Sequence, residues 1–250
     1  MKDEKLAVLI DADNVSHANV KEMLDEIAKY GNPTIKRIYA DWTKPTTSGW
    51  KNVLLENAIT PIQQYSYTTG KNSSDSALII DAMDLLYSEK VSGFCIVSSD
   101  SDFTRLATRL REAAMFVIGI GEKKTPKPFI TACDKFIYIE ILKKEKEQKP
   151  SADEKLNKQR KAKTKDSSVN DIDKKLVELI KDSIDEISDD NGWAFLGALG
   201  SFIIKKKTDF DSRNYGFPKL YPLIKSVGKF EIEERESGKN NIRHIYLKNK

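Results

Sequence analysis

The sequence predicts an α/β protein with a mainly parallel sheet flanked by helices in three layers, followed by a smaller domain of helices and a hairpin. Three observations support this. Short runs rich in β-branched residues alternate with amphipathic stretches over residues 1–142. A lysine-rich segment follows, and the last 80 residues carry three helical patterns and one alternating pattern. A chain of 250 residues is long enough for one medium and one small domain.

Six strands are expected before the lysine-rich segment, separated by helices. The strand candidates are Leu6–Ile10, Ile35–Ala40, Ile62–Tyr67, Gly93–Ser98, Phe116–Ile120 and Phe136–Ile141. The helix candidates are Val20–Tyr30, Gly49–Asn57, Ser76–Tyr87 and Phe103–Ala113. In open sheets of this kind, ligands bind beyond the carboxyl ends of the strands.

The positive charge is concentrated between the two expected domains. We count 17 Lys and Arg against 19 Asp and Glu in residues 1–142, 10 against 5 in 143–170, and 15 against 14 in 171–250, so −2, +5 and +1 give the net +4. Residues 143–170 contain only Leu156 and Val169 as sizeable apolar side chains and are expected to be a flexible basic linker. Two interpretations of this segment are equally favoured: it attracts polyanions through counterion release, or it is only a solvated spacer.

Composition excludes several classes of function. No apolar run approaches the roughly 18 residues of a membrane helix. Met1–Lys5 has no apolar core of a secretory signal, so we expect a cytoplasmic protein. Cys95 and Cys133 lie in apolar stretches and are assigned no chemistry. With only His17 and His244 as histidines, any catalysis is expected to depend on carboxylates.

Acidic residues follow two of the expected buried strands. Asp11 comes directly after the first strand, and Asp100 and Asp102 follow the fourth. Asp75 opens the helix that begins near Ser76. These side chains are expected at one edge of the sheet, where mutual repulsion favours a hard divalent ion with oxygen ligands, Mg²⁺ or Mn²⁺. Such an ion activates water and stabilises charge on a phosphoryl oxygen, as phosphodiester hydrolysis requires.

Each acid also has a purely structural interpretation. Asp102 suits a helix N-cap, Asp75 suits the first turn of a helix, and Asp13 suits a turn. Capping does not explain why acids follow both buried strands, so catalytic and metal-binding roles are favoured for Asp11, Asp75, Asp100 and Asp102.

Four further polar residues lie near these acids in the sequence. Asn14 is expected to orient a carboxylate or the substrate phosphate, and Lys71 suits either phosphate contact or an ordinary loop. Asp81 and Asp84 are interpreted as a polar helix edge rather than as ligands.

With these residues in place, the segment Leu6–Ile141 resembles the NYN family of PIN-like nucleases. The matching elements are Ile10 to Asn14, Lys71 to Asp75 with the helix after them, and Ser99 to Phe103. The resemblance implies a PIN-like, Rossmann-like three-layer sandwich whose acidic edge binds Mg²⁺ or Mn²⁺ and cleaves RNA. It assigns the site to Asp11, Asn14, Asp75, Asp100 and Asp102. Some PIN-like domains bind RNA without cutting it.

After the linker, three helices and a hairpin predict a winged helix. The helices are expected at Ile172–Ile187, Trp193–Ile204 and Leu220–Val227, and the hairpin at Phe230–Leu247. The order of Gly192, Trp193, Phe210, Arg213 and Tyr215 with their neighbours resembles the LOTUS, or OST-HTH, module over residues 171–250. That resemblance implies RNA binding or protein docking.

Four basic residues of this domain are candidates for substrate binding. Lys205, Lys206, Lys207 and Arg213 suit phosphate contacts, and the three lysines equally suit the end of a helix dipole.

Two functions of different classes remain, with a minor third. The first is a divalent-metal-dependent ribonuclease acting on single-stranded RNA and targeted by the LOTUS-like module, which also offers a site for a protein partner. The second is a non-cleaving RNA-binding adaptor that retains the acidic pocket. The third is a phosphatase of the haloacid dehalogenase type, because Asp11 to Val15 fits that family's short nucleophile motif. The early helix after Asp11 leaves little room for the flap of such phosphatases.

Overall fold

The computed structural model describes residues 4–65, 73–142, 172–237 and 242–250, with side chains not described at 237 and 242. The described residues form two compact units, one on each side of residues 143–171, and each is described by itself. Lys71 and the expected linker, residues 143–170, lie outside the described residues. The domain boundaries at residues 142 and 171 therefore stay predictions.

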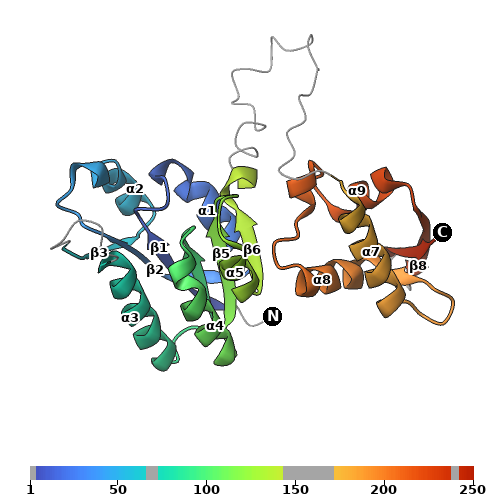
Figure 1. The fold of residues 1–250 in the computed structure, drawn as a ribbon, viewed down its shortest axis with the longest axis horizontal. Coiled ribbons are helices and arrows are strands. Elements are labelled where there is room, and N and C mark those ends of the chain that lie inside the picture. Colours follow the sequence, from blue (N-terminus) through green and yellow to red (C-terminus); the bar gives the residue numbers. More distant parts are fainter. Residues whose placement is uncertain (1–3, 66–72, 143–171, 238–241) are drawn as a thin grey trace, which may run out of the picture. The chain divides into compact units, whose positions relative to one another are not determined.

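The first unit contains a parallel sheet of six described strands (Figure 1). They are β1 (Lys5–Asp11), β2 (Asn32–Ala40), β3 (Thr60–Gln63), β4 (Gly93–Val97), β5 (Phe116–Gly121) and β6 (Lys135–Tyr138). Their order is β3-β2-β1-β4-β5-β6, with every neighbouring pair parallel. The chain builds outward from β1 in one direction and from β4 in the other, so the strand order reverses between β1 and β4. Such a switch point is where open parallel sheets bind ligands.

Helices cover both faces of this sheet, as the alternating sequence pattern predicts. They are α1 (Val20–Ile27), α2 (Trp50–Glu56), α3 (Ser73–Tyr87), α4 (Thr104–Glu112) and α5 (Lys127–Ala132), with short 3-10 helices η1 (His17–Asn19), η2 (Pro45–Thr47) and η3 (Ser101–Phe103). α3, α4 and α5 share one hydrophobic core with Ala7 and Leu9 of β1. In Figure 1, α3 and α4 lie in front of the sheet and α1 behind it.

Three details of this unit differ from the expectations. β3 ends at Gln63 rather than continuing toward Tyr67, which lies outside the described residues. β6 ends at Tyr138, and residues 139–142 are helical rather than the end of a strand. The short helix α5 was not expected; it begins after Pro126, whose φ of −62° and ψ of 138° suit an N-cap position.

The second unit packs three helices against a small antiparallel sheet. Its elements are α7 (Lys174–Ile187), β7 (Ala194–Phe195), α8 (Leu196–Lys206), η5 (Ser212–Tyr215), α9 (Leu220–Val227), β8 (Phe230–Ser237) and β9 (Ile242–Asn249). The described strands lie in the order β7-β9-β8, with β8 and β9 paired as the expected hairpin. Asp173 caps α7 by accepting the Leu176 N–H at 2.8 Å. Strand β7 and η5 are additions to the expected winged helix.

Within the described residues, the longest and most apolar helices still fall short of what a membrane crossing requires.

Candidate metal centre

Asp11 is the last residue of β1, and its side chain is fully buried at 0% exposure. Three donors hold the carboxylate in place. Asn14 donates its side-chain N–H to Oδ2 at 2.6 Å, the Ser98 hydroxyl donates to Oδ2 at 2.9 Å, and the Asp13 backbone N–H donates to Oδ1 at 3.1 Å. Burial raises the pKa of Asp11, although the three hydrogen bonds oppose that shift. Asn14 therefore donates a hydrogen bond to a carboxylate of the site, whereas its contact with a substrate phosphate stays a prediction.

Ser98 links the ends of the two strands at the switch point. It follows β4, and its hydroxyl oxygen accepts the Asp100 backbone N–H at 3.1 Å while donating to Asp11. Asp100 then accepts the Asp102 backbone N–H at 2.9 Å and so caps η3. The capping acid is thus Asp100, whereas Asp102 lies in the first turn. Sequence analysis assigned Ser98 no role, because a serine after a strand carries no signal until the neighbouring strand is known.

Asp75, Asp100 and Asp102 form a carboxylate cluster. One oxygen from each lies within 4.8 Å of the others. Asp75 lies in the first turn of α3 and is only 8% exposed. Its pKa is raised to about 6, first by burial and then by the negative charges of Asp11, Asp100, Asp102 and Asp13. The structure therefore brings three of the four predicted acids together. Asp11 lies outside the group, but its negative charge contributes to the raised pKa of Asp75.

The cluster fits a hard divalent ion. Its donors are carboxylate oxygens, which Mg²⁺ and Mn²⁺ prefer, and a cation there would remove the repulsion that raises the pKa of Asp75. Asp75, Asp100 and Asp102 are the side chains that would hold it. The two oxygens of Asp11 already accept hydrogen bonds, so direct ligation by Asp11 stays a prediction.

Asp81 is engaged away from this cluster. Its carboxylate forms an ion pair with Arg37 and accepts a hydrogen bond from the Tyr39 hydroxyl. Asp84 is exposed on the same helix. Both observations agree with the interpretation of these residues as a polar edge.

The predicted basic residues of the second unit have partners within it. Lys206 pairs with Glu186 at 2.5 Å, and Lys207 donates to the Tyr215 hydroxyl at 3.0 Å. Arg213 forms a two-point ion pair with Asp211, at 2.7 Å and 3.0 Å. Lys205 is exposed at the end of α8. Phosphate binding by these four residues, and by Lys71, stays a prediction.

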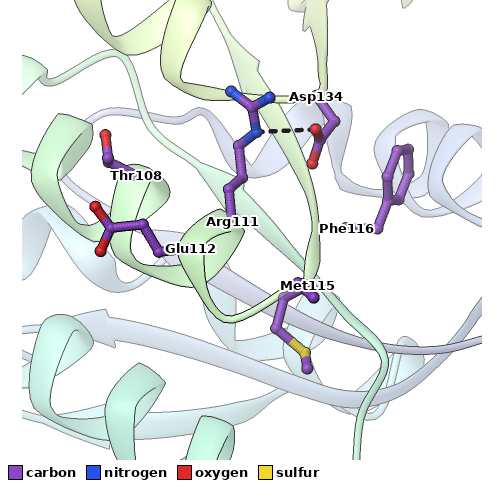
Figure 2. Close-up of a pocket in the computed structure, with 7 residues that line it drawn as sticks. Thr108, Arg111, Glu112, Met115, Phe116 and Asp134 are labelled. Atoms are coloured by element: carbon purple, nitrogen blue, oxygen red, sulfur yellow. Dashed lines mark ion pairs between the residues drawn. The ribbon is translucent and has the colours of Figure 1, made fainter.

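A pocket of about 560 Å³ lies at the amino ends of the strands, opposite the end that carries the carboxylate cluster (Figure 2). It is lined by residues at the end of α4 and the start of β5, and by Asp134 just before β6. In Figure 2, Arg111 points toward Asp134, with which it forms an ion pair at 2.8 Å. Asp134 also accepts the Val117 backbone N–H at 2.9 Å. These polar groups therefore have partners within the pocket. Because the pocket lies at the amino ends of β5 and β6, it is separate from the acidic cluster at the carboxyl ends of the strands.

Two protein-family models match the chain. The family model of the NYN domain matches residues 5–140, which is more than half of the chain. The chain belongs to the NYN domain family. NYN domains are a PIN-like nuclease family, and the matched segment contains β1, β4, α3 and the whole carboxylate cluster. The model of the OST-HTH/LOTUS domain matches residues 167–242, so the NYN domain is followed by a LOTUS domain.

Other comparisons add little. No curated protein matches the chain. Among solved structures, a protein of unknown function from Vibrio parahaemolyticus is 20% identical, covering 55% of this chain and 93% of its own, with a TM-score of 0.47. An uncharacterised protein of Nitrosomonas europaea is 31% identical, covering 41% of this chain and 90% of its own, with a TM-score of 0.28. At these TM-scores, neither likeness carries a structural or functional conclusion.

Proposed function

We propose that the chain is a divalent-metal-dependent ribonuclease that hydrolyses RNA phosphodiester bonds at the edge of the NYN sheet. The observation that carries the proposal is the cluster of Asp75, Asp100 and Asp102 beside buried Asp11, at the switch point between β1 and β4. A Mg²⁺ or Mn²⁺ ion bound there would activate water and stabilise negative charge on the phosphoryl oxygen.

The protein's own residues position the cluster. Asp100 is held by its cap to η3 and by Ser98, while Asp75 is held by α3. Ser98 and Asn14 fix the carboxylate of Asp11, whose negative charge acts on Asp75 and so increases the attraction of the cluster for a cation. Because the acids come from three different segments, the site forms only in the folded domain.

A non-cleaving RNA-binding adaptor is the alternative from another class. Against it, clustered carboxylates repel the phosphates of RNA, so a binding module gains nothing from keeping them unless they hold a cation. The adaptor remains the function to conclude if the cluster binds metal and RNA without cleavage.

A phosphatase of the haloacid dehalogenase type is disfavoured by the surroundings of Asp11. The proposed nucleophile would be fully buried, with hydrogen bonds to both oxygens. The described chain from Ala12 to Ser16 forms turns that lead directly into η1, with no strand pair for a flap in that stretch.

The decisive assay is cleavage of labelled single-stranded RNA with Mn²⁺ or Mg²⁺, compared with the same reaction in EDTA. The wild type should cut only with metal, whereas Asp100→Asn should lose activity while its amide oxygen can still cap η3. Asp84→Asn, which alters an exposed acid of α3 outside the cluster, is the matched control and should cut like the wild type. Cleavage in EDTA, or equal cleavage by Asp100→Asn, would overturn the proposal.

A further inference from the structure

The sheet of the LOTUS domain has one face turned toward its helices and one turned away. On the inner face, Ala194 and Leu247 are fully buried, and Phe230 is 4% exposed. Strand alternation places the neighbouring residues on the other side. There Trp193 precedes β7, Phe195 lies on β7, Arg235 on β8, and His244, Tyr246 and Lys248 on β9. These six residues are called the aromatic face.

The side chains of the aromatic face contact one another. The Phe195 ring lies 5.2 Å from the His244 ring and 5.8 Å from the Tyr246 ring, measured between centroids. The Arg235 guanidinium lies over Tyr246 at 4.3 Å and over Trp193 at 5.1 Å. The Lys248 ammonium lies 5.9 Å from the Trp193 ring. Cations and rings therefore form one continuous surface across the three strands.

Phe195 is held in an exposed position by the local packing. It is 39% exposed, and it is absent from the hydrophobic core of its domain. Gly197, in the first turn of α8, lies against its ring, because a Cβ at Gly197 would meet the Phe195 Cε1 atom at 2.7 Å. The ring can thus present a π-surface outward while its inner edge rests on the helix.

We propose that the aromatic face binds single-stranded RNA, with unpaired bases stacking on Phe195 and His244 and with Arg235 and Lys248 near the phosphates. The inference rests on the proposed function in that it takes RNA as the target of the chain. Exposed aromatic side chains on a sheet are a general means of stacking about two or three unpaired bases. Stacking tolerates any sequence, because every base has a π-face.

The chemistry of the face favours RNA over a protein partner. Ser237 and Ile242 continue the outer register, but their side chains lie outside the described residues. Every outer position with a described side chain on β7, β8 and β9 holds an aromatic or charged residue, whereas a hydrophobic docking surface for a protein would be expected to include aliphatic ones among them. Two acids, Glu231 and Glu233, also occupy this side, and Glu233 pairs with Arg235 at 2.9 Å. The face is therefore not strongly basic, so stacking rather than counterion release is expected to supply its affinity.

The test measures binding of a fluorescent single-stranded RNA to the full chain in EDTA, where cleavage is suppressed and failure of the nuclease proposal does not affect the result. Phe195→Leu keeps apolar bulk but removes the ring, and it should weaken binding about tenfold. The slope of log affinity against log salt should stay unchanged, because no charge is removed. His244→Leu, at a second position, should act in the same direction.

Matched controls separate stacking from general effects. Phe116→Leu makes the same change at a ring of nearly equal exposure, 40%, in the NYN unit, and it should bind RNA like the wild type. Arg235→Gln should weaken binding, whereas Arg243→Gln should not, since Arg243 pairs with Glu234 on the other side of the same hairpin. Duplex RNA should compete poorly, because its bases are already stacked.

Melting curves establish that each variant is folded. Wild-type RNA affinity in both Phe195→Leu and His244→Leu, or equally tight binding of duplex RNA, would overturn the proposal. The aromatic face would then be assigned to a protein partner.

Discussion

The raised pKa of Asp75 has a consequence for stability that can be measured without any substrate. The pKa rises from 3.8 to about 6, so the folded protein holds this proton more tightly than the unfolded chain does. Stability therefore falls as pH rises between these two values, and the ionised side chain destabilises the metal-free protein above pH 6. A shift of about two units corresponds to about 3 kcal/mol as an upper bound.

Asp75→Asn should remove this destabilisation at pH 7.5. The variant loses a favourable charge in the first turn of α3, which offsets about 0.3–1 kcal/mol, so the free energy of unfolding in EDTA should rise by about 1–3 kcal/mol. Near pH 3.5, where Asp75 is mostly protonated in both states, most of the difference should disappear. Asp84→Asn, on the exposed side of the same helix, should change stability by less than about 0.5 kcal/mol.

Urea unfolding followed by tryptophan fluorescence measures this effect. Trp42 and Trp50 lie in the NYN unit and Trp193 in the LOTUS unit, so a Trp193→Phe background restricts the signal to the unit that contains Asp75. Adding Mg²⁺ or Mn²⁺ should then stabilise the wild type more than Asp75→Asn, since binding to the folded state adds to its stability. An Asn variant that is no more stable than the wild type in EDTA at pH 7.5 would refute the reasoning.

Three further outcomes are expected. Ser98→Ala should lower Mn²⁺ affinity by about 10- to 100-fold, because it releases Asp11 and the Asp100 backbone together; unchanged affinity in a Mn²⁺ titration would contradict the role assigned to Ser98. Limited trypsin digestion should cut first between Lys143 and Asp171 and leave two stable fragments, as the lysine-rich composition predicts; digestion of either domain before this segment would show a misplaced boundary. A fragment of residues 1–142 should bind RNA more weakly than the full chain and with a flatter salt dependence, because it lacks segments of formal charge +5 and +1. At saturating RNA and metal, the fragment should retain much of its turnover. If its RNA affinity and salt slope equalled those of the full chain, the removed part would instead be assigned to protein docking.

Most of the fold follows from patterns that are local in the sequence. β1 and β4 are continuous apolar runs of the kind that a parallel sheet buries on both faces, and α1 and α4 show clear apolar stripes. The end of β6 was predicted wrongly for a physical reason. Residues 137–142 are almost continuously apolar and buried, and such a run does not distinguish a strand from a helix.

The candidate site was predictable to the extent that it depends on strand ends. Asp11 ends one buried strand and Asp100 comes after another, which predicts their common edge, and Asp75 lies in the first turn of a helix that begins at the same edge. The bridge through Ser98 was not predictable, because it requires β1 and β4 to be neighbours although 87 residues separate Asp11 from Ser98. The aromatic face was missed for a similar reason, since Phe195 and Tyr246 meet only through the pairing of β7 with β9.

Direct measurement of Mn²⁺ binding to the full chain tests the central claim, that the carboxylate cluster is a divalent-metal site. Titration calorimetry or electron paramagnetic resonance should detect a bound ion in the wild type and in Asp84→Asn. Asp75→Asn, Asp100→Asn and Asp102→Asn should each lose most of this binding, because each removes one of the three grouped oxygen ligands. Folded variants that bind Mn²⁺ as tightly as the wild type would contradict the account.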